Sequence, residues 1–148
     1  MSQNAKVIMA CDISIAAIVK DVTDILRKHG CSVTDAGESE VITEFTRSAE
    51  IVAEKVQSGE YDRGVVFCGS GIGVCMAANK FKGIRAALAY DVLPAALARS
   101  EQNTNVLCTG AWTMESPEKC ARMIETWLMC GYGGADEEGM KAAERIQE

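Results

Sequence analysis

Short apolar runs alternate with longer amphipathic segments along most of the chain. The runs are rich in Val, Ile and Ala and predict strands, whereas the amphipathic segments repeat their apolar residues at helical spacing. The predicted strands are Lys6–Cys11, Cys31–Asp35, Val65–Cys68, Ile84–Ala89 and Asn105–Thr109. The predicted helices cover residues 15–29, 44–58, 74–80, 93–100, 116–129 and 136–147. This alternation predicts an α/β fold, a three-layer sandwich in which a five-stranded, mostly parallel sheet carries helices on both faces, as in Rossmann-like proteins.

The last predicted helix, Asp136–Gln147, has few apolar residues. A helix this polar buries little within its own chain. We therefore expect residues 1–148 to form one domain whose C-terminal helix packs on a partner subunit.

The composition favours a soluble, cytoplasmic protein. The chain has 148 residues, 48% of them hydrophobic, and a net charge of −6, so we expect no nucleic-acid partner and no attachment to anionic membranes. No apolar stretch approaches the roughly 18 residues of a membrane span, and no secretory leader is expected. The chain has seven cysteines, one histidine and no C-x-x-C pair. These features predict reduced thiols rather than disulfides, and neither a metal nor a cofactor is expected.

The stretch Gly64–Lys80, GVVFCGSGIGVCMAANK, carries the clearest chemical signal. A buried strand ends at Cys68, a glycine-rich turn follows in Gly69–Gly73, and a helix then begins. In a parallel α/β protein such a loop lies at the carboxyl end of the sheet, where the helix start offers free N–H groups to an anion or a developing oxyanion. The pattern G-S-G-I-G matches neither dinucleotide-binding nor P-loop spacing, so it is weak evidence for a nucleotide.

Three features allow two interpretations each. Because a helix N-terminus stabilises a thiolate, Cys68 could act as a base or nucleophile, but a buried cysteine is as often a small apolar side chain without chemistry. Asp12, which follows the first strand, is either a ligand at the sheet edge or the cap of the next helix. The polar loop 100–104 is solvated by default, but it precedes a strand and could face a site.

The blocks GVVFCGSGIGVCMAANKFKGIRAAL and NTNVLCTG, with a weaker match around Trp127 and Tyr132, resemble the ribose-5-phosphate isomerase B and galactose-6-phosphate isomerase family. The resemblance spans nearly the whole chain. It implies an aldose–ketose isomerase of a sugar phosphate that moves a proton between C1 and C2 through an enediol. It also implies a homodimer or tetramer whose active sites combine residues of two subunits.

The resemblance further implies roles for individual residues. Cys68 matches the family's base, and Ser70 matches the hydroxyl residue that supports it. Asp12 matches the aspartate after the first strand, and Gln102 or Asn103 matches the asparagine of the loop before the fifth strand. The backbone N–H groups that hold the enediolate oxygen correspond to the glycine loop, including Gly69, Gly71, Ile72 and Gly73.

Other positions depart from the family pattern. Ile13 stands where a histidine usually follows the aspartate, and Glu44-Phe45-Thr46 stands for an Asp-Tyr-Pro segment, so that a carboxylate is kept at Glu44. Glu101 replaces the histidine that opens the sugar ring. It could still shuttle a proton if burial helps it to hold one, or it could be an ordinary solvated residue.

The phosphate-binding positions differ most. The family's arginines correspond to Trp112, Asp136 and Met140, and a nearby histidine corresponds to Glu137, so positive charge is lost at each of them. Trp112 could stack on a sugar ring or simply cap the core, and Asp136 could bond sugar hydroxyls or be a helix-start charge.

The substitutions leave three hypotheses for the substrate. It is a sugar phosphate held by other basic residues, it is a sugar without phosphate, or the chain needs a partner subunit or binds sugars without turnover. We expect isomerase chemistry, because the base and its loop are intact, and we place the phosphorylated substrate first on the precedent of the family. Candidate phosphate ligands are Arg47, Lys82, Arg99 and Arg145. Arg85, within an apolar strand, is expected to be structural.

Overall fold

The computed structural model describes residues 4–146, so Gln147 of the predicted C-terminal helix lies outside the described residues. A five-stranded sheet forms the middle layer, in the order β2-β1-β3-β5-β4, and all of its pairings are parallel. The strands are β1 (Lys6–Ala10), β2 (Ser32–Asp35), β3 (Arg63–Cys68), β4 (Ala86–Leu88) and β5 (Val106–Gly110). The expected three-layer α/β sandwich is therefore confirmed.

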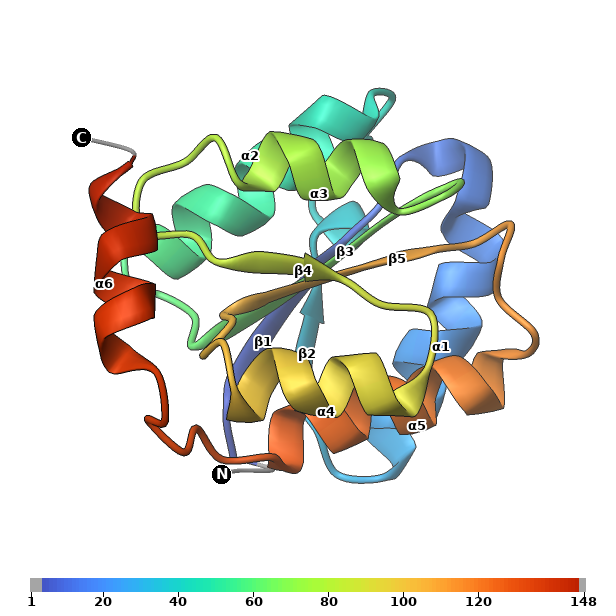
Figure 1. The fold of residues 1–148 in the computed structure, drawn as a ribbon. Coiled ribbons are helices and arrows are strands. Elements are labelled where there is room, and N and C mark those ends of the chain that lie inside the picture. Colours follow the sequence, from blue (N-terminus) through green and yellow to red (C-terminus); the bar gives the residue numbers. More distant parts are fainter. Residues whose placement is uncertain (1–3, 147–148) are drawn as a thin grey trace.

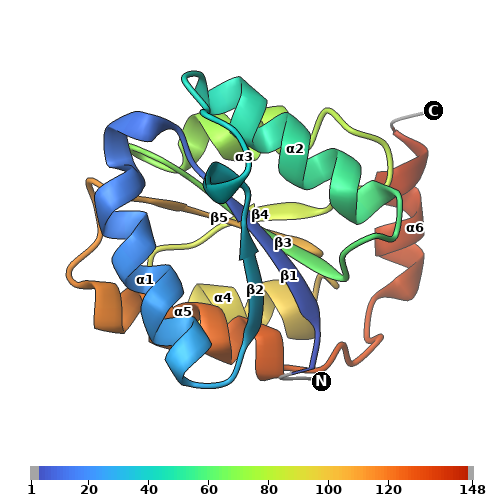
Figure 2. The ribbon, with the colours of Figure 1, turned by 180° about the vertical axis from the view of Figure 1, so that it is seen from behind.

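Helices cover both faces of the sheet (Figures 1 and 2). One face carries α1 (Ala16–Lys28), α4 (Val92–Ser100) and α5 (Pro117–Met129), and the other carries α2 (Phe45–Gln57) and α3 (Ile72–Ala78). Short 3₁₀ turns follow two of the strands, η1 (Ile13–Ile15) and η2 (Ala36–Glu38). These bounds lie within a few residues of the predicted ones.

Strand β4 is shorter than the predicted run Ile84–Ala89. Before it, the N–H of Arg85 donates to the side-chain oxygen of Asn105 over 2.8 Å, and the N–H of Asn105 donates to Arg85 O over 3.0 Å. The Asn105 side chain thus accepts a hydrogen bond that a backbone carbonyl would accept in a regular strand pair. The parallel pairing of β4 with β5 therefore begins only at Ala86.

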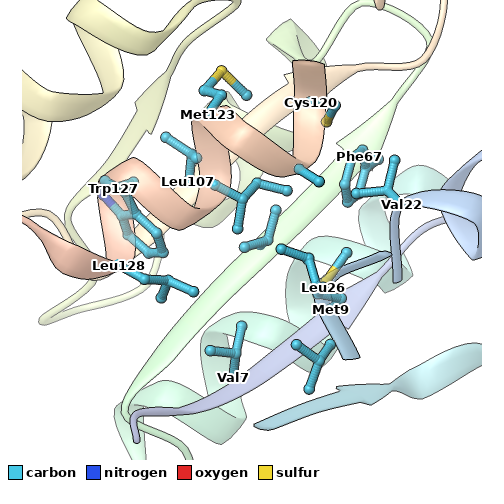
Figure 3. Close-up of a cluster of buried hydrophobic side chains, with 14 of the residues drawn as sticks. Val7, Met9, Val22, Leu26, Phe67, Leu107, Cys120, Met123, Trp127 and Leu128 are labelled. Carbon is cyan, nitrogen blue, oxygen red and sulfur yellow. The ribbon is translucent and has the colours of Figure 1, made fainter. Parts of the chain in front are cut away.

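The larger of the two cores lies between the sheet and the layer of α1, α4 and α5. Figure 3 shows side chains of α1 and α5 meeting those of β1, β3 and β5 there. Trp127 is fully buried, and its indole N–H donates to the hydroxyl of Thr104 over 2.9 Å, so its one polar group is satisfied. This bond ties α5 to the segment that precedes β5.

Strand β3 lies in the middle of the sheet and is packed on both faces. Its sequence RGVVFC is apolar after the first residue, as expected for a parallel strand covered by helices on both sides. Glycine is required at position 64, because an ideal Cβ there would lie 2.2 Å from Val52 Cγ1 on α2. The absence of a side chain at Gly64 lets α2 approach the sheet closely.

The C-terminal helix α6 (Glu137–Arg145) lies beyond the amino ends of the strands, at the left of Figure 1. None of its residues is buried. Asp136 caps it by accepting the N–H of Gly139 over 3.1 Å, and Glu144 pairs with Arg85 over 3.4 Å. Among the helices of the described chain, none combines the length and the apolar character that a membrane crossing requires.

Replacing Gly64 by alanine should destabilise the fold by about 1–3 kcal/mol, because the new methyl group would overlap a stiff β-branched side chain. Urea unfolding followed by circular dichroism measures the loss. Gly131→Ala is the matched control, since no atom lies within 4 Å of an ideal Cβ at that position. An unchanged midpoint for Gly64→Ala would contradict the close approach of α2.

Candidate active site

The carboxyl ends of β1, β3 and β5 bring three of the predicted site residues to one edge of the sheet. Ala10 pairs with Val66, and Cys68 pairs with Gly110. The carboxyl ends of these three neighbouring strands therefore carry Asp12, Cys68 and Trp112 side by side. Parallel α/β proteins bind their ligands at this edge.

Cys68 is the last residue of β3 and is 8% exposed. Its Sγ accepts the N–H of Gly71 over 3.2 Å, and the Oγ of Ser70 accepts the N–H of Ile72 over 3.2 Å. The thiol therefore lies beside the first turn of α3, in contact with a backbone donor. Ser70 is half-buried next to it.

Strand β5 and the loop after β4 fix the backbone of this glycine loop. The N–H of Ala111 donates to Cys68 O over 2.9 Å, and the N–H of Trp112 donates to Gly69 O over 2.8 Å. The hydroxyl of Tyr90 donates to Ser70 O over 2.6 Å. Sequence reasoning missed Tyr90, although its place directly after the fourth predicted strand puts it at the same edge.

Two glycines of the loop permit contacts that no other residue could make. Gly71 has a φ of 80°, and an ideal Cβ there would lie 2.6 Å from Thr109 C. At Gly69 the ideal Cβ would lie 2.3 Å from the indole ring of Trp112. Trp112 is 81% exposed, so it does not cap the core; its ring lies over Gly69 at the surface.

Asp12 caps the 3₁₀ turn η1. Its Oδ1 accepts the N–H of Ser14 over 2.9 Å and also the Ser14 hydroxyl. The capping interpretation therefore holds for Oδ1, while the position of Asp12 at the carboxyl edge remains compatible with a ligand.

Two buried thiols near Cys68, at the carboxyl end of β1 and on β5, are poorly suited to act as a base. Burial raises the pKa of Cys11 to about 12, and the carboxylates of Asp35 and Asp12 add to the shift. Burial likewise raises the pKa of Cys108 well above its ordinary value. Both therefore stay protonated at neutral pH.

Glu44 lies close to the glycine loop, because the next residue, Phe45, contacts it. It is exposed at the start of α2 and makes no side-chain cap, and the ring of Phe45 lies 3.0 Å from an ideal Cβ on Gly73. The first turn of α2 thus faces the first turn of α3 at the mouth of the site. Ile13, in place of the family's histidine, is 62% exposed nearby on η1.

The remaining candidates lie at the opposite edge. Glu101, Gln102 and Asn103 precede β5, whereas Cys68 pairs with the last residue of β5. A rise of about 3.3 Å per residue makes β5 alone about 13 Å long. Asp136, at the start of α6, lies on the same distant side. Within one chain, therefore, none of these residues meets Cys68.

A cavity of about 140 Å³ at this amino edge includes two of the positions to which the resemblance assigned phosphate binding, Glu137 and Met140. It is lined by Asn103, Tyr132, Glu137 and Met140, together with Arg85, Lys141 and Glu144. A neighbouring cavity of about 330 Å³ extends along α6 and includes Gln102. The positive charges of the smaller cavity are balanced by Glu137 and Glu144.

The alternative phosphate ligands are unequally available. Arg47 is engaged by Glu40 over 3.2 Å and also by Glu50. Arg99 is 5% exposed, and its guanidinium donates to the side-chain oxygen of Asn103. Lys82 and Arg145 are exposed.

Open parallel α/β proteins bind small ligands at the carboxyl edge of the sheet, and this chain has its glycine loop and the Cys68 thiol there. The model of a family described as Ribose/Galactose Isomerase matches residues 7–148. The chain therefore belongs to this family of aldose–ketose isomerases, and the predicted resemblance is confirmed.

Individual relatives agree with this assignment. The chain is 34% identical over 129 residues to a 4-deoxy-4-sulfo-D-erythrose isomerase of Clostridium sp. (strain MSTE9), covering 86% of this chain and 80% of that one. It is 34% identical over 132 residues to a D-erythrulose-4-phosphate isomerase of Pectobacterium atrosepticum, covering 86% and 81%. The structure of Clostridium thermocellum ribose-5-phosphate isomerase B superposes with a TM-score of 0.88 at 30% identity, covering 96% of this chain and 97% of that one.

The contact between Trp112 and Gly69 predicts a coupled pair of substitutions. Gly69→Ala alone should destabilise the fold by about 1–3 kcal/mol, because its methyl group would overlap the indole. In a Trp112→Ala background the same change should have little effect, since the obstructing ring is gone. A double-mutant cycle from urea midpoints measures the coupling. Additive effects of the two substitutions would show that the ring does not lie on Gly69.

Proposed function

We propose that the chain is an aldose–ketose isomerase of a sugar phosphate, with Cys68 as the base that moves a proton between C1 and C2. The observation that carries the proposal is the place of Cys68. Its Sγ lies at the end of the central strand, 3.2 Å from the N–H of Gly71, at the edge where ligands bind.

The chemistry follows from the groups at this edge. The Cys68 thiolate removes the proton from C2 of the open-chain aldose, and the electron pair passes into the C1 carbonyl to give an enediolate. Backbone N–H groups of the glycine loop stabilise the oxyanion, and Ser70 supports the thiol. The thiol then returns the proton to C1, while a proton moves from O2 to O1, which gives the ketose. Asp12, beside Cys68, is suited to bind a substrate hydroxyl.

The active site, in this proposal, combines two copies of the chain. Glu101, Gln102 and Asn103 lie at the amino edge and can reach a Cys68 only in a second copy. Helix α6 buries none of its residues, so it has a face to offer to that copy. Asp136, Glu137 and Met140 would then lie near the far end of the substrate, where Lys141 of the same cavity can pair with an anionic group, and Trp112 and Glu44 would lie nearer the glycine loop.

Within this class, a four-carbon substrate with an anionic group at C4 fits the chain best. Two relatives are named for such substrates, a C4 sulfonate and a C4 phosphate. A tetrose substituted at C4 lacks the hydroxyl that would close a furanose ring, so it needs no ring-opening group. The replacement of the family's ring-opening histidine by Glu101 is consistent with an open-chain substrate, on which Glu101 would instead carry the proton from O2 to O1.

Deuterium exchange in D₂O, followed by NMR, tests the activity and the substrate together. We expect deuterium at C1 or C2 of D-erythrose 4-phosphate, with slower exchange for D-ribose 5-phosphate and none for unphosphorylated pentoses. Exchange of free sugars alone would instead assign Trp112 and Asp136 to hydroxyl recognition. Absence of exchange with every sugar in a folded protein would contradict turnover.

Cys68→Ala should lower the exchange rate by about a thousandfold or more, because it removes the proposed base for the C2 proton. Cys31→Ala is the matched control: this cysteine is also buried, but it precedes β2 at the opposite edge, and the rate should not change. Equal rates for the two variants would exclude Cys68 as the base.

Mixing two impaired variants tests the shared site. Cys68→Ala and a Glu101→Ala/Gln102→Ala variant, each with only a small residual rate alone, should recover about a quarter of the parent rate after co-refolding, since half of the random dimers would carry one intact site. Sedimentation shows whether dimers have formed. Dimers without recovered turnover would indicate sites that lie within single chains.

A further inference from the structure

The loop between α4 and β5 contains an unusual backbone conformation. Asn103 has a φ of 49°, and in the described part of the chain it is the one residue other than glycine with a positive φ. Asparagine tolerates this left-handed region better than most residues, but it still needs neighbouring groups to hold it there. Residues in such a conformation are often found at functional sites.

Two arginines hold Asn103 in place. The Nε of Arg85 donates to Asn103 O over 2.7 Å, and Nη1 of Arg99 donates to the Asn103 side-chain oxygen over 3.2 Å. Arg99 also donates to Thr104 O. The Thr104 hydroxyl donates to Ala98 O over 2.9 Å and accepts from Trp127. These bonds attach both Asn103 and Thr104 to the body of the chain.

Arg99 makes these bonds at a cost to stability. It is 5% exposed, it forms no ion pair with a carboxylate of the described residues, and its Nε has no partner there. Burial and the nearby charges of Arg63 and Arg85 lower the pKa of Arg99 to about 10. A buried guanidinium without a carboxylate is unfavourable for folding, so a purely structural role would be better served by an apolar side chain.

The bonds at Asn103 also restrict the two residues before it, Glu101 and Gln102. Glu101 ends α4 with its N–H bonded to Leu97 O over 2.9 Å, and both Glu101 and Gln102 have exposed side chains. The helix fixes the backbone of these two residues on one side, and the bonds of Asn103 fix it on the other. The loop is therefore preorganised before any second copy arrives.

We infer that Arg85 and Arg99 are positioning residues, which hold Asn103 in its left-handed conformation so that Glu101 and Gln102 are presented to Cys68 of a second copy. The inference rests on the proposed function, because it requires the loop to belong to the active site. Neither arginine contacts the substrate. Both act through the loop.

The decisive measurement is the kcat for Arg99→Met in two backgrounds, with D-erythrose 4-phosphate and D-ribose 5-phosphate as the substrates. In the parent chain we expect kcat to fall about tenfold, since displaced site groups lose much of their effect. In the Glu101→Ala/Gln102→Ala background, where a residual rate is measured at high enzyme concentration, the same change should have no further effect. Arg63→Met is the control; Arg63 is half-buried at the same edge but bonds only to Asp62 O, and its kcat should not change.

The outcomes separate the possible failures. An unchanged kcat for Arg99→Met, an equal loss in both backgrounds, or a parent-like rate for the Glu101→Ala/Gln102→Ala chain would each overturn the inference. Retention of full exchange by Cys68→Ala would instead overturn the proposed function.

A second pair of variants covers the case in which Arg99→Met does not fold. Asn103→Gly keeps the left-handed conformation accessible, whereas Asn103→Ala does not. If the arginines act by holding that conformation, Asn103→Ala should have a lower kcat than Asn103→Gly, with faster amide hydrogen exchange across residues 101–105. Equal rates in the two variants would also overturn the inference.

Discussion

The parallel pairing of β3 with β5 is the interaction on which the candidate site depends. It continues past both strands, since Cys68 O and Gly69 O accept the N–H groups of Ala111 and Trp112. The two backbones run so close that an ideal Cβ on Gly110 would lie 2.7 Å from Gly69 O. The glycines of this region are therefore required by the sheet itself, and the position of the thiol and the indole follows from the same hydrogen bonds.

Because all five strands run in one direction, the sheet has two chemically different edges. The proposed base, its loop and Asp12 lie where strands end, while Glu101, Gln102 and Asp136 lie where strands begin. No local rearrangement can bring the two groups together within one chain. In the proposed function the enzyme is therefore complete only as an assembly, and the edge that carries the base can stay unchanged while the other edge varies.

The sequence was sufficient for the layers and for the position of Cys68. Strand and helix periods are local signals, and a strand followed by a glycine turn and a helix places its last residue at the carboxyl edge whatever the rest of the chain does. The contacts of Trp112 and Tyr90 could not be predicted in the same way, because a ring lying on a glycine at the surface leaves no periodic signal. The bond between Arg85 and Asn103 joins residues 18 apart in sequence and depends on how β4 and β5 pair. That pairing is a tertiary property.

The exposure of α6 has a consequence for how this chain can change over evolutionary time. No residue of α6 is buried in its own chain, so substitutions along it have little effect on the stability of the monomer. In the proposed assembly the same helix lines the far end of the substrate. Selection for a new substrate can then act on α6 without opposing selection for a folded chain, whereas the glycine loop, which the sheet constrains on every side, has no such freedom.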